Sequence, residues 1–138
     1  MLSLIRVAAG ILSRDGRVLI CRRGGQDAFA GKWEFPGGKL REGESPEEAL
    51  VRELEEELDI RVAGESLQWI ETVRHTYANG PHVELHFFGV PRFEGEPVNR
   101  CFGAMEWVPP SRMEEFDFLE ADRPLVRRLA AGGLLSGR

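Results

Sequence analysis

The sequence predicts an α/β fold in which a sheet lies between two main helices, an α/β/α sandwich. Three observations support this. Short apolar runs are separated by turn residues, a helical pattern follows Ser45, and a second helical pattern fills 124–131. The chain has 138 residues and is 42% hydrophobic. It is therefore long and apolar enough for one domain, spanning 1–138, with a buried core.

The N-terminal part of the expected sheet starts with a hairpin. Apolar runs at 4–12 and 17–22 flank Asp15-Gly16, a strong signal for a tight turn between antiparallel strands. The chain then continues into the first helix. Between the hairpin and that helix we expect a loop at 24–31, a short strand at 33–35 and a turn at Gly37-Gly38.

The first helix is predicted to begin at Pro46. Ser45 is a good N-cap, Pro46 suits the first helical position, and Glu48 completes a capping box with Ser45. At about 100° per residue, the apolar positions fall on one arc of this helix. They are Leu50, Val51, Leu54 and Leu58. An adjoining arc, about 100° wide, holds three acids. They are Glu53, Glu56 and Glu57.

The C-terminal part is expected to supply the remaining strands and the second helix. Apolar runs at 67–77 and 82–90 flank Asn79-Gly80-Pro81, which predicts a second hairpin. The expected elements after it are a polar loop at 92–100, a strand at 105–108 stopped by Pro109-Pro110, a short helix at 111–116, and a helix at 124–131 stopped by Gly132-Gly133.

Composition restricts the possible partners. The net charge of -5 argues against binding of a DNA or RNA polymer, whose phosphates usually need a basic surface. A single nucleotide needs only a metal ion or two and a local arginine, so a small anionic substrate is favoured. Cys21 and Cys101 form no spaced framework and are expected to be free thiols. We find neither a membrane span nor a signal peptide and expect a cytoplasmic protein; nothing predicts an oligomeric state.

The acidic arc of the first helix predicts a metal site. Like charges three or four residues apart destabilise a helix by roughly 0.2–0.5 kcal/mol per pair, and a divalent cation offsets that cost. A solvated acidic face would give the same pattern, but the flanking residues favour the metal. Carboxylate oxygens are hard ligands, which points to Mg²⁺, with Mn²⁺ as a possible substitute.

Together with its flanks, this helix resembles the Nudix box. The matching positions are Gly38, Glu44, Arg52, Glu53, Leu54, Glu56, Glu57 and Ile60. The preceding WEFPGGK, at 33–39, resembles the MutT-type branch of the family. Asp59 stands where the family has a glycine that ends the helix in the left-handed conformation; Asp tolerates this at a cost of about 1 kcal/mol. The resemblance implies a mixed sheet flanked by the Nudix helix and a C-terminal helix.

The resemblance also implies a catalytic arrangement. Glu53, Glu56 and Glu57 would hold the cation, together with a backbone carbonyl of Gly37 or Gly38. The cation lowers the pKa of water and orients it for in-line attack on phosphorus. Glu53 would then accept the proton of that water. Arg52 would hold Glu53 in place, and Glu44 would support the metal site.

MutT-type enzymes cleave nucleoside triphosphates to the monophosphate and pyrophosphate, which implies a role in nucleotide-pool sanitation with 8-oxo-dGTP as the leading substrate. The implied substrate contacts are Arg23 for phosphates, Glu34 and Phe35 for the nucleoside, and Asp122 for the base edge. Tyr77 is a further candidate, as a stacking surface, although an aromatic residue in a strand is more often part of the core. An ionised Asp122 would accept from N1–H and N2–H of guanine, although Asp122 next to Pro124 is also a natural N-cap. The Ala-Asp-x-Pro sequence at 121–124 also resembles CTP-type enzymes, so CTP or a modified dCTP is the second candidate.

A further difference from the MutT-type pattern lies in the loop before Trp107. Cys101 aligns with a Glu that MutT-type proteins often have there, and Glu96 or Glu106 is a candidate to replace it. This departure keeps open a second class of function, a Nudix-like module that senses nucleotides without cleaving them. Other Nudix substrates, such as ADP-ribose and dinucleoside polyphosphates, also remain open.

Overall fold

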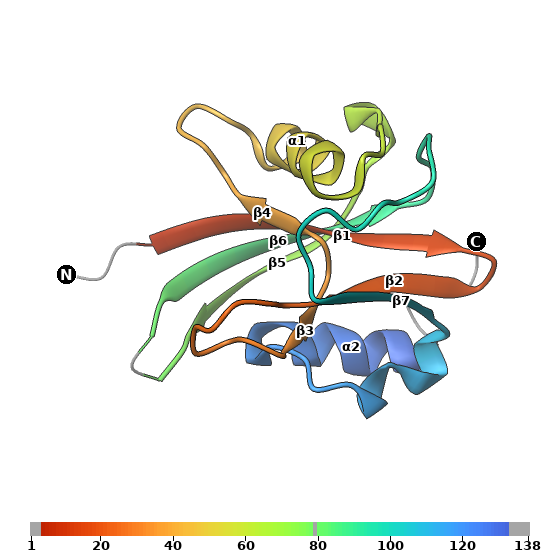
Figure 1. Cartoon of the computed structure of the whole chain (residues 1–138). Helices are drawn as coiled ribbons and strands as arrows, with labels where there is room; N and C mark the ends of the chain where they lie inside the picture. Colours follow the sequence, from red (N-terminus) through yellow and green to blue (C-terminus); the bar gives the residue numbers. More distant parts are fainter. Residues whose placement is uncertain (1–3, 79, 133–138) are drawn as a thin grey trace.

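The structure, a computed structural model, describes residues 4–78 and 80–132, and in these residues seven strands form one sheet between two α-helices (Figure 1). The strands are β1 (Leu4–Arg14), β2 (Arg17–Arg22), β3 (Trp33–Glu34), β4 (Gly37–Lys39), β5 (Gln68–Thr76), β6 (His82–Val90) and β7 (Ala104–Val108). The α-helices are α1 (Pro46–Leu58) and α2 (Arg123–Ala130), and three 3₁₀ turns are η1 (Gly64–Ser66), η2 (Pro110–Glu115) and η3 (Glu120–Asp122). The helices cover opposite faces of the sheet, so the predicted α/β/α sandwich is confirmed.

Strand β1 joins the parts of the sheet. It pairs in parallel with β6 from Leu4↔His82 to Leu12↔Val90, and antiparallel with β4. It meets β2 only next to the turn, at Ser13↔Val18 and Arg14↔Arg17. The predicted hairpin is therefore present but short, because the rest of β1 hydrogen-bonds to β6 and β4. One parallel pairing among antiparallel ones makes the sheet mixed, and the β5–β6 hairpin is antiparallel as predicted.

Two predicted elements are corrected. Gly37-Gly38 is not a turn but part of β4, in register with Ala8 and Ala9 of β1. Glycine permits this pairing, because a Cβ on Gly37 would lie 2.0 Å from the carbonyl oxygen of Ala8. The short helix predicted at 111–116 is the 3₁₀ turn η2. Asn79 and Gly133 lie outside the described residues.

Helix α1 begins and ends as predicted. The Ser45 hydroxyl accepts from the Glu48 N–H at 3.1 Å, and the Glu48 carboxylate accepts from the Ser45 N–H at 2.9 Å. At the other end Asp59 adopts the left-handed conformation (φ 59°, ψ 37°), and its N–H donates to the Glu55 carbonyl at 3.0 Å. The Asp59 carboxylate also pairs with Arg100 at 3.2 Å. Aspartate therefore ends this helix in the conformation that glycine favours.

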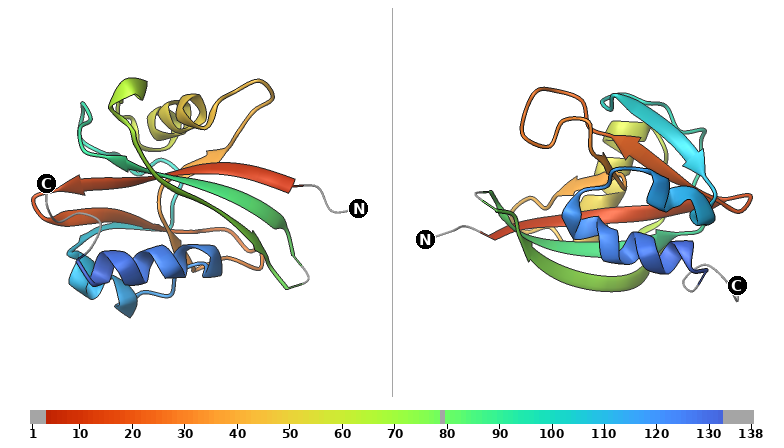
Figure 2. Two further views of the ribbon diagram at one scale, coloured as in Figure 1. Left: turned by 180° about the vertical axis from the view of Figure 1, so that it is seen from behind. Right: turned by 90° about the horizontal axis from the view of Figure 1, so that it is seen from below.

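The two α-helices lie against opposite faces of the sheet (Figure 2), and each face has its own hydrophobic core. Under α1, Leu50, Leu54 and Leu58 are fully buried among side chains that include Leu19 and Phe88. Under α2, the core contains Phe35, Phe87, Phe118, Leu125, Val126 and Leu129. With these leucines facing the sheet, two acids of the adjoining arc, Glu53 and Glu57, contact β4. None of the helices in the described part of the chain is both long and apolar enough to cross a bilayer.

Candidate active site

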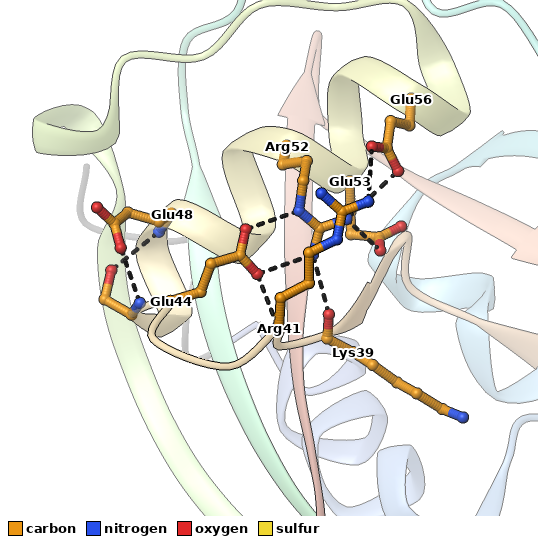
Figure 3. A network of polar contacts seen from close by, with 8 residues as sticks. Lys39, Arg41, Glu44, Glu48, Arg52, Glu53 and Glu56 are labelled. Atoms are coloured by element: carbon orange, nitrogen blue, oxygen red, sulfur yellow. Dashed lines mark hydrogen bonds and ion pairs between the residues drawn. The ribbon is translucent and has the colours of Figure 1, made fainter.

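Arg52 of α1 is the centre of a polar network (Figure 3). Its guanidinium donates to the Glu44 carboxylate through Nε at 2.7 Å and Nη2 at 2.9 Å. Nη2 also donates to the Lys39 carbonyl at 3.0 Å. Nη1 donates to Glu53 at 2.9 Å and to Glu56 at 3.3 Å. Arg52 thus connects the loop before α1, strand β4 and the acidic arc, and its position fixes one oxygen of Glu53.

Glu44 acts on this network through Arg52. Its Oε1 also accepts from the Arg41 N–H at 2.8 Å, so both carboxylate oxygens have donors. These bonds favour the charged form, and the hydrogen bond from Arg52 is the main reason that the pKa of Glu44 falls to about 2. Glu44 is therefore ionised over the physiological range and orients Arg52.

Glu53 and Glu57 meet the backbone of β4. Glu57 Oε1 accepts from the Gly37 N–H at 3.2 Å. The Glu53 carboxylate lies against Gly38, where an added Cβ would be 2.4 Å from the carboxyl carbon. Burial, followed by the nearby Glu53 carboxylate, raises the pKa of Glu57 to about 8. Two half-buried acids this close need a proton or a cation between them, and their hard oxygens suit a divalent metal.

Glu56 does not join the other two acids. Its carboxylate is 51% exposed and pairs with Arg52 and, at 3.6 Å, with Arg41. Among residues 4–78 and 80–132, no group of three or more His, Cys, Asp or Glu side chains is arranged to hold a metal ion. The structure therefore brings together two of the three predicted acidic ligands, because the two guanidiniums set the side-chain conformation of Glu56.

A cavity of about 570 Å³ lies next to these acids. Gly37, Gly38 and Glu57 form part of its wall. All five residues predicted to contact substrate line the same cavity: Arg23, Glu34, Phe35, Tyr77 and Asp122. They lie in or directly after β2, β3, β5 and η3, so residues distant in sequence share one space that adjoins the acidic pair.

Arg23 provides a cation in this cavity. Its Nη1 donates to Glu34 at 3.4 Å and its Nη2 to Asp27 at 3.3 Å. Its buried Nε has no hydrogen-bond partner in the described part of the structure. Burial raises the pKa of Glu34, and the Arg23 charge opposes that rise. The side-chain contacts of Arg23 are thus long, at 3.3–3.4 Å, and its guanidinium is only weakly held by Glu34 and Asp27.

Asp122 is almost completely buried, with 3% of its surface exposed. Its side chain makes no hydrogen bond that caps α2, so the N-cap alternative is not supported. Burial raises the pKa of Asp122 well above its usual range, and the nearby Glu34 charge adds to this, while the Phe35 N–H opposes it. Burial thus favours the neutral carboxyl of Asp122, which has one donor and one acceptor, over the ionised acceptor expected from sequence.

The other residues that line the cavity include Phe29, which sequence reasoning did not place in a site, and Cys101. Partial burial, with Glu57 and other acids nearby, raises the pKa of Cys101 to about 11, so its thiol is neutral. Glu96 pairs instead with Arg14 at 2.9 Å, and Glu106 is exposed on β7. Neither of these acids lines the cavity, so neither replaces the loop Glu at Cys101.

Comparisons with known proteins agree on one family. The NUDIX domain model matches residues 4–129. The chain is 36% identical over 131 residues to a CTP pyrophosphohydrolase of Escherichia coli (strain K12), covering 94% of each protein. It is also 36% identical over 126 residues to the 8-oxo-dGTP diphosphatase of the same strain, covering 91% of this chain and 95% of that protein.

Solved structures are similar over nearly the whole chain. The ORF135 protein of E. coli superposes with a TM-score of 0.81 at 34% identity, covering 99% of this chain and 94% of that one. A MutT NUDIX hydrolase from Burkholderia pseudomallei gives a TM-score of 0.78 at 28% identity, covering 91% of this chain and 97% of that one.

Proposed function

Since the chain belongs to the NUDIX family of hydrolases, which generally use a divalent metal, we propose that it is a magnesium-dependent nucleoside triphosphate pyrophosphohydrolase. One observation supports this most directly. Glu57 of the acidic pair and the residues proposed to bind the nucleoside line a single cavity of about 570 Å³, and Glu53 lies against Gly38 in the wall of that cavity. We further propose that 1–138 is one catalytic domain and that its substrate is a free nucleotide and not a nucleic-acid polymer, as the net charge of -5 favours.

The proposed reaction is hydrolysis of the anhydride between the α- and β-phosphates. Glu53 and Glu57, with Glu56 after a change of side-chain conformation and a carbonyl of Gly37 or Gly38, would hold the ion. Bound Mg²⁺ would neutralise phosphate oxygens and lower the pKa of water. Water would attack one of the two phosphorus atoms, and the bond from that phosphorus to the bridging oxygen would break. The products would be the nucleoside monophosphate and pyrophosphate, and the proton of the water would pass to Glu53.

Other side chains would position these reactants. Arg52 holds one Glu53 oxygen at 2.9 Å, which fixes the direction in which the other oxygen accepts a proton. Arg23 would exchange its long contacts to Glu34 and Asp27, at 3.3–3.4 Å, for a phosphate oxygen, which offers a stronger charge-assisted bond. Phe35 and Tyr77 would contact the nucleoside from the cavity wall.

The leading substrate is 8-oxo-dGTP, which would make the protein a nucleotide-pool sanitising enzyme with a role in DNA repair. This choice rests on the relatives named for that activity. One observation favours CTP, or a modified dCTP, as a second candidate. A neutral Asp122 can donate to O6 and accept from N1–H of guanine, and it can equally donate to N3 and accept from N4–H of cytosine.

A substrate panel tests the proposal. Pyrophosphate release would be measured with Mg²⁺ on dGTP, 8-oxo-dGTP, CTP, dCTP and ADP-ribose. The Glu53→Gln variant would be compared with Glu55→Gln, since Glu55 is an exposed acid of the same helix. We expect release from 8-oxo-dGTP well above dGTP, a loss of about 10²–10⁴-fold in Glu53→Gln, and little change in Glu55→Gln. Equal rates on dGTP and 8-oxo-dGTP would remove the sanitising role. If no nucleotide released pyrophosphate, the result would favour the alternative function, a module that senses nucleotides without cleaving them.

A further inference from the structure

Tyr77 connects β5 to the segment that contains Asp122. It directly follows β5, its side chain lines the cavity, and its hydroxyl accepts from the Ala121 N–H at 3.2 Å. Ala121 is the residue before Asp122. A phenol that accepts one hydrogen bond keeps its own proton to donate. The contact therefore fixes the backbone next to Asp122 and leaves a donor at the cavity wall.

His75 strengthens the same connection. Its Nε2 lies 3.3 Å from Glu120 Oε1, and its ring packs edge to face on Tyr77 with centroids 4.5 Å apart. Side chains at the end of β5 and directly after it thus contact both residues that precede Asp122, Glu120 and Ala121. No described residue other than Tyr77 makes a side-chain hydrogen bond to the Ala121 N–H.

The Tyr77 ring also contacts the loop at 24–31. Phe29 packs edge to face on it, with centroids 4.9 Å apart at 63°, and also lines the cavity. Phe29 comes from between β2 and β3, so a single phenol ring contacts two walls of the cavity that are distant in sequence. Such edge-to-face pairs depend on ring orientation, so the contact restrains both rings.

We propose that Tyr77 is a positioning residue for nucleobase selection, fixing Asp122 through its hydroxyl and Phe29 through its ring. The proposal deepens the proposed function and rests on it only in taking Asp122 as the group that contacts the base. Hydrogen bonds to a base edge depend on direction, so a small shift of the Asp122 carboxyl weakens the match to one base more than to others. Bond cleavage occurs at the acids near β4, so Tyr77 should influence binding and not the chemical step.

Binding of nucleoside monophosphates tests this without requiring turnover. Dissociation constants for dGMP, 8-oxo-dGMP, CMP and dCMP would be measured for the wild type, Tyr77→Phe, Asp122→Ala and the double variant. Tyr77→Phe keeps the ring and removes the acceptor for the Ala121 N–H. For each variant we take the ratio of the dissociation constants of the weakest and the tightest ligand. We expect this ratio to fall about 3- to 10-fold in Tyr77→Phe, which corresponds to the loss of one hydrogen bond. In the Asp122→Ala background, Tyr77→Phe should cause no further loss.

Trp69→Phe is the matched control. It also removes one hydrogen bond of an aromatic side chain on β5, from Trp69 Nε1 to the Thr72 hydroxyl at 3.0 Å, but Trp69 is 63% exposed and does not line the cavity. Its ligand ratios should equal those of the wild type. His75→Phe, which keeps the ring and removes the Glu120 contact, should lower the ratio in the same direction as Tyr77→Phe.

Kinetics separate this proposal from the proposed function. On the preferred triphosphate, Tyr77→Phe should raise KM while kcat stays within about 2-fold, because the lost bond is not at the reacting atoms. The positioning role would be overturned if the ratios of dissociation constants were unchanged in both Tyr77→Phe and His75→Phe. It would also be overturned if the losses in the double variant were fully additive. Either result would leave the proposed hydrolysis intact. A wild type that discriminates among monophosphates but cleaves no triphosphate would instead overturn the hydrolysis and leave the positioning role standing.

Discussion

The carboxylate of Glu53 occupies the space that a side chain at Gly38 would need. A Cβ added to Gly38 would lie 2.4 Å from the Glu53 carboxyl carbon and 2.6 Å from each of its oxygens. Gly38 is held by its pairing with Ala8 of β1, and Glu53 is held by Arg52 at 2.9 Å. The sheet and the helix therefore fix the proposed base from two directions.

Gly38→Ala should displace this carboxylate and stop catalysis without unfolding the protein. Glu53 can move because it is a flexible side chain, so we expect pyrophosphate release to fall about 100-fold or more while the melting temperature changes little. Gly64→Ala is the matched control, since its nearest contact would be Val51 at 4.0 Å. Normal activity in Gly38→Ala would show that the position of Glu53 does not matter.

Arg52→Lys tests the network around Glu44. Lysine keeps the charge but cannot bond Glu44 through two nitrogens while it also reaches Glu53 and the Lys39 carbonyl. We expect kcat to fall about 10-fold or more, with a smaller change in KM, because the lost contacts orient the base. Steady-state kinetics on the best substrate would measure this. A change confined to KM would indicate that Arg52 serves substrate binding.

Glu84 should make the fold sensitive to acid. Hydrogen bonds from Arg6, then Arg74 and His86, lower the pKa of Glu84 from 4.5 to about 2. A carboxyl with a lowered folded-state pKa stabilises the protein above its unfolded value of 4.5, and this contribution is lost as the pH falls from 4.5 toward 2. The difference in melting temperature between the wild type and Glu84→Gln should thus be largest near pH 7 and shrink below pH 4.5. A difference that stays constant down to pH 3 would contradict this.

Cys101→Glu should strengthen metal binding. The residue lines the cavity with Glu57, and its neutral thiol adds no negative charge there. A carboxylate at this position adds a hard, charged oxygen near the acidic pair, so we expect half-maximal activity at a Mg²⁺ concentration several-fold lower. Cys101→Ser, which adds no charge, should behave like the wild type. An unchanged or higher Mg²⁺ requirement in Cys101→Glu would show that this loop does not face the ion.

Local chemistry made part of this fold predictable. The start of α1 follows from Ser45, Pro46 and Glu48, which interact within one turn, and the left-handed Asp59 follows from its place at the helix end. Strand β4 was not predictable in the same way. Its partner β1 lies about 30 residues earlier in the chain, and Gly37 and Gly38 read locally as a turn.

The features of the site that the sequence did not predict also depend on residues that are distant in the chain or on burial. Sequence placed Glu53, Glu56 and Glu57 on one arc, but the conformation of Glu56 depends on Arg41, which approaches from outside the helix. The charge state of Asp122 depends on its burial, which no neighbouring residue in the chain reveals. Phe29 lies in a loop without periodic pattern, so its contact with Tyr77 appears only in the folded chain.

The most direct test of the account is a crystal structure with Mg²⁺ and a triphosphate analogue whose bridging oxygen between the α- and β-phosphates is replaced by a non-hydrolysable group. We predict one ion with oxygens of Glu53 and Glu57 at about 2.1 Å, a phosphate oxygen of the analogue on the same ion, and Glu56 turned away from Arg41. An ion bound elsewhere, with Glu53 and Glu57 directed into solvent, would contradict the account.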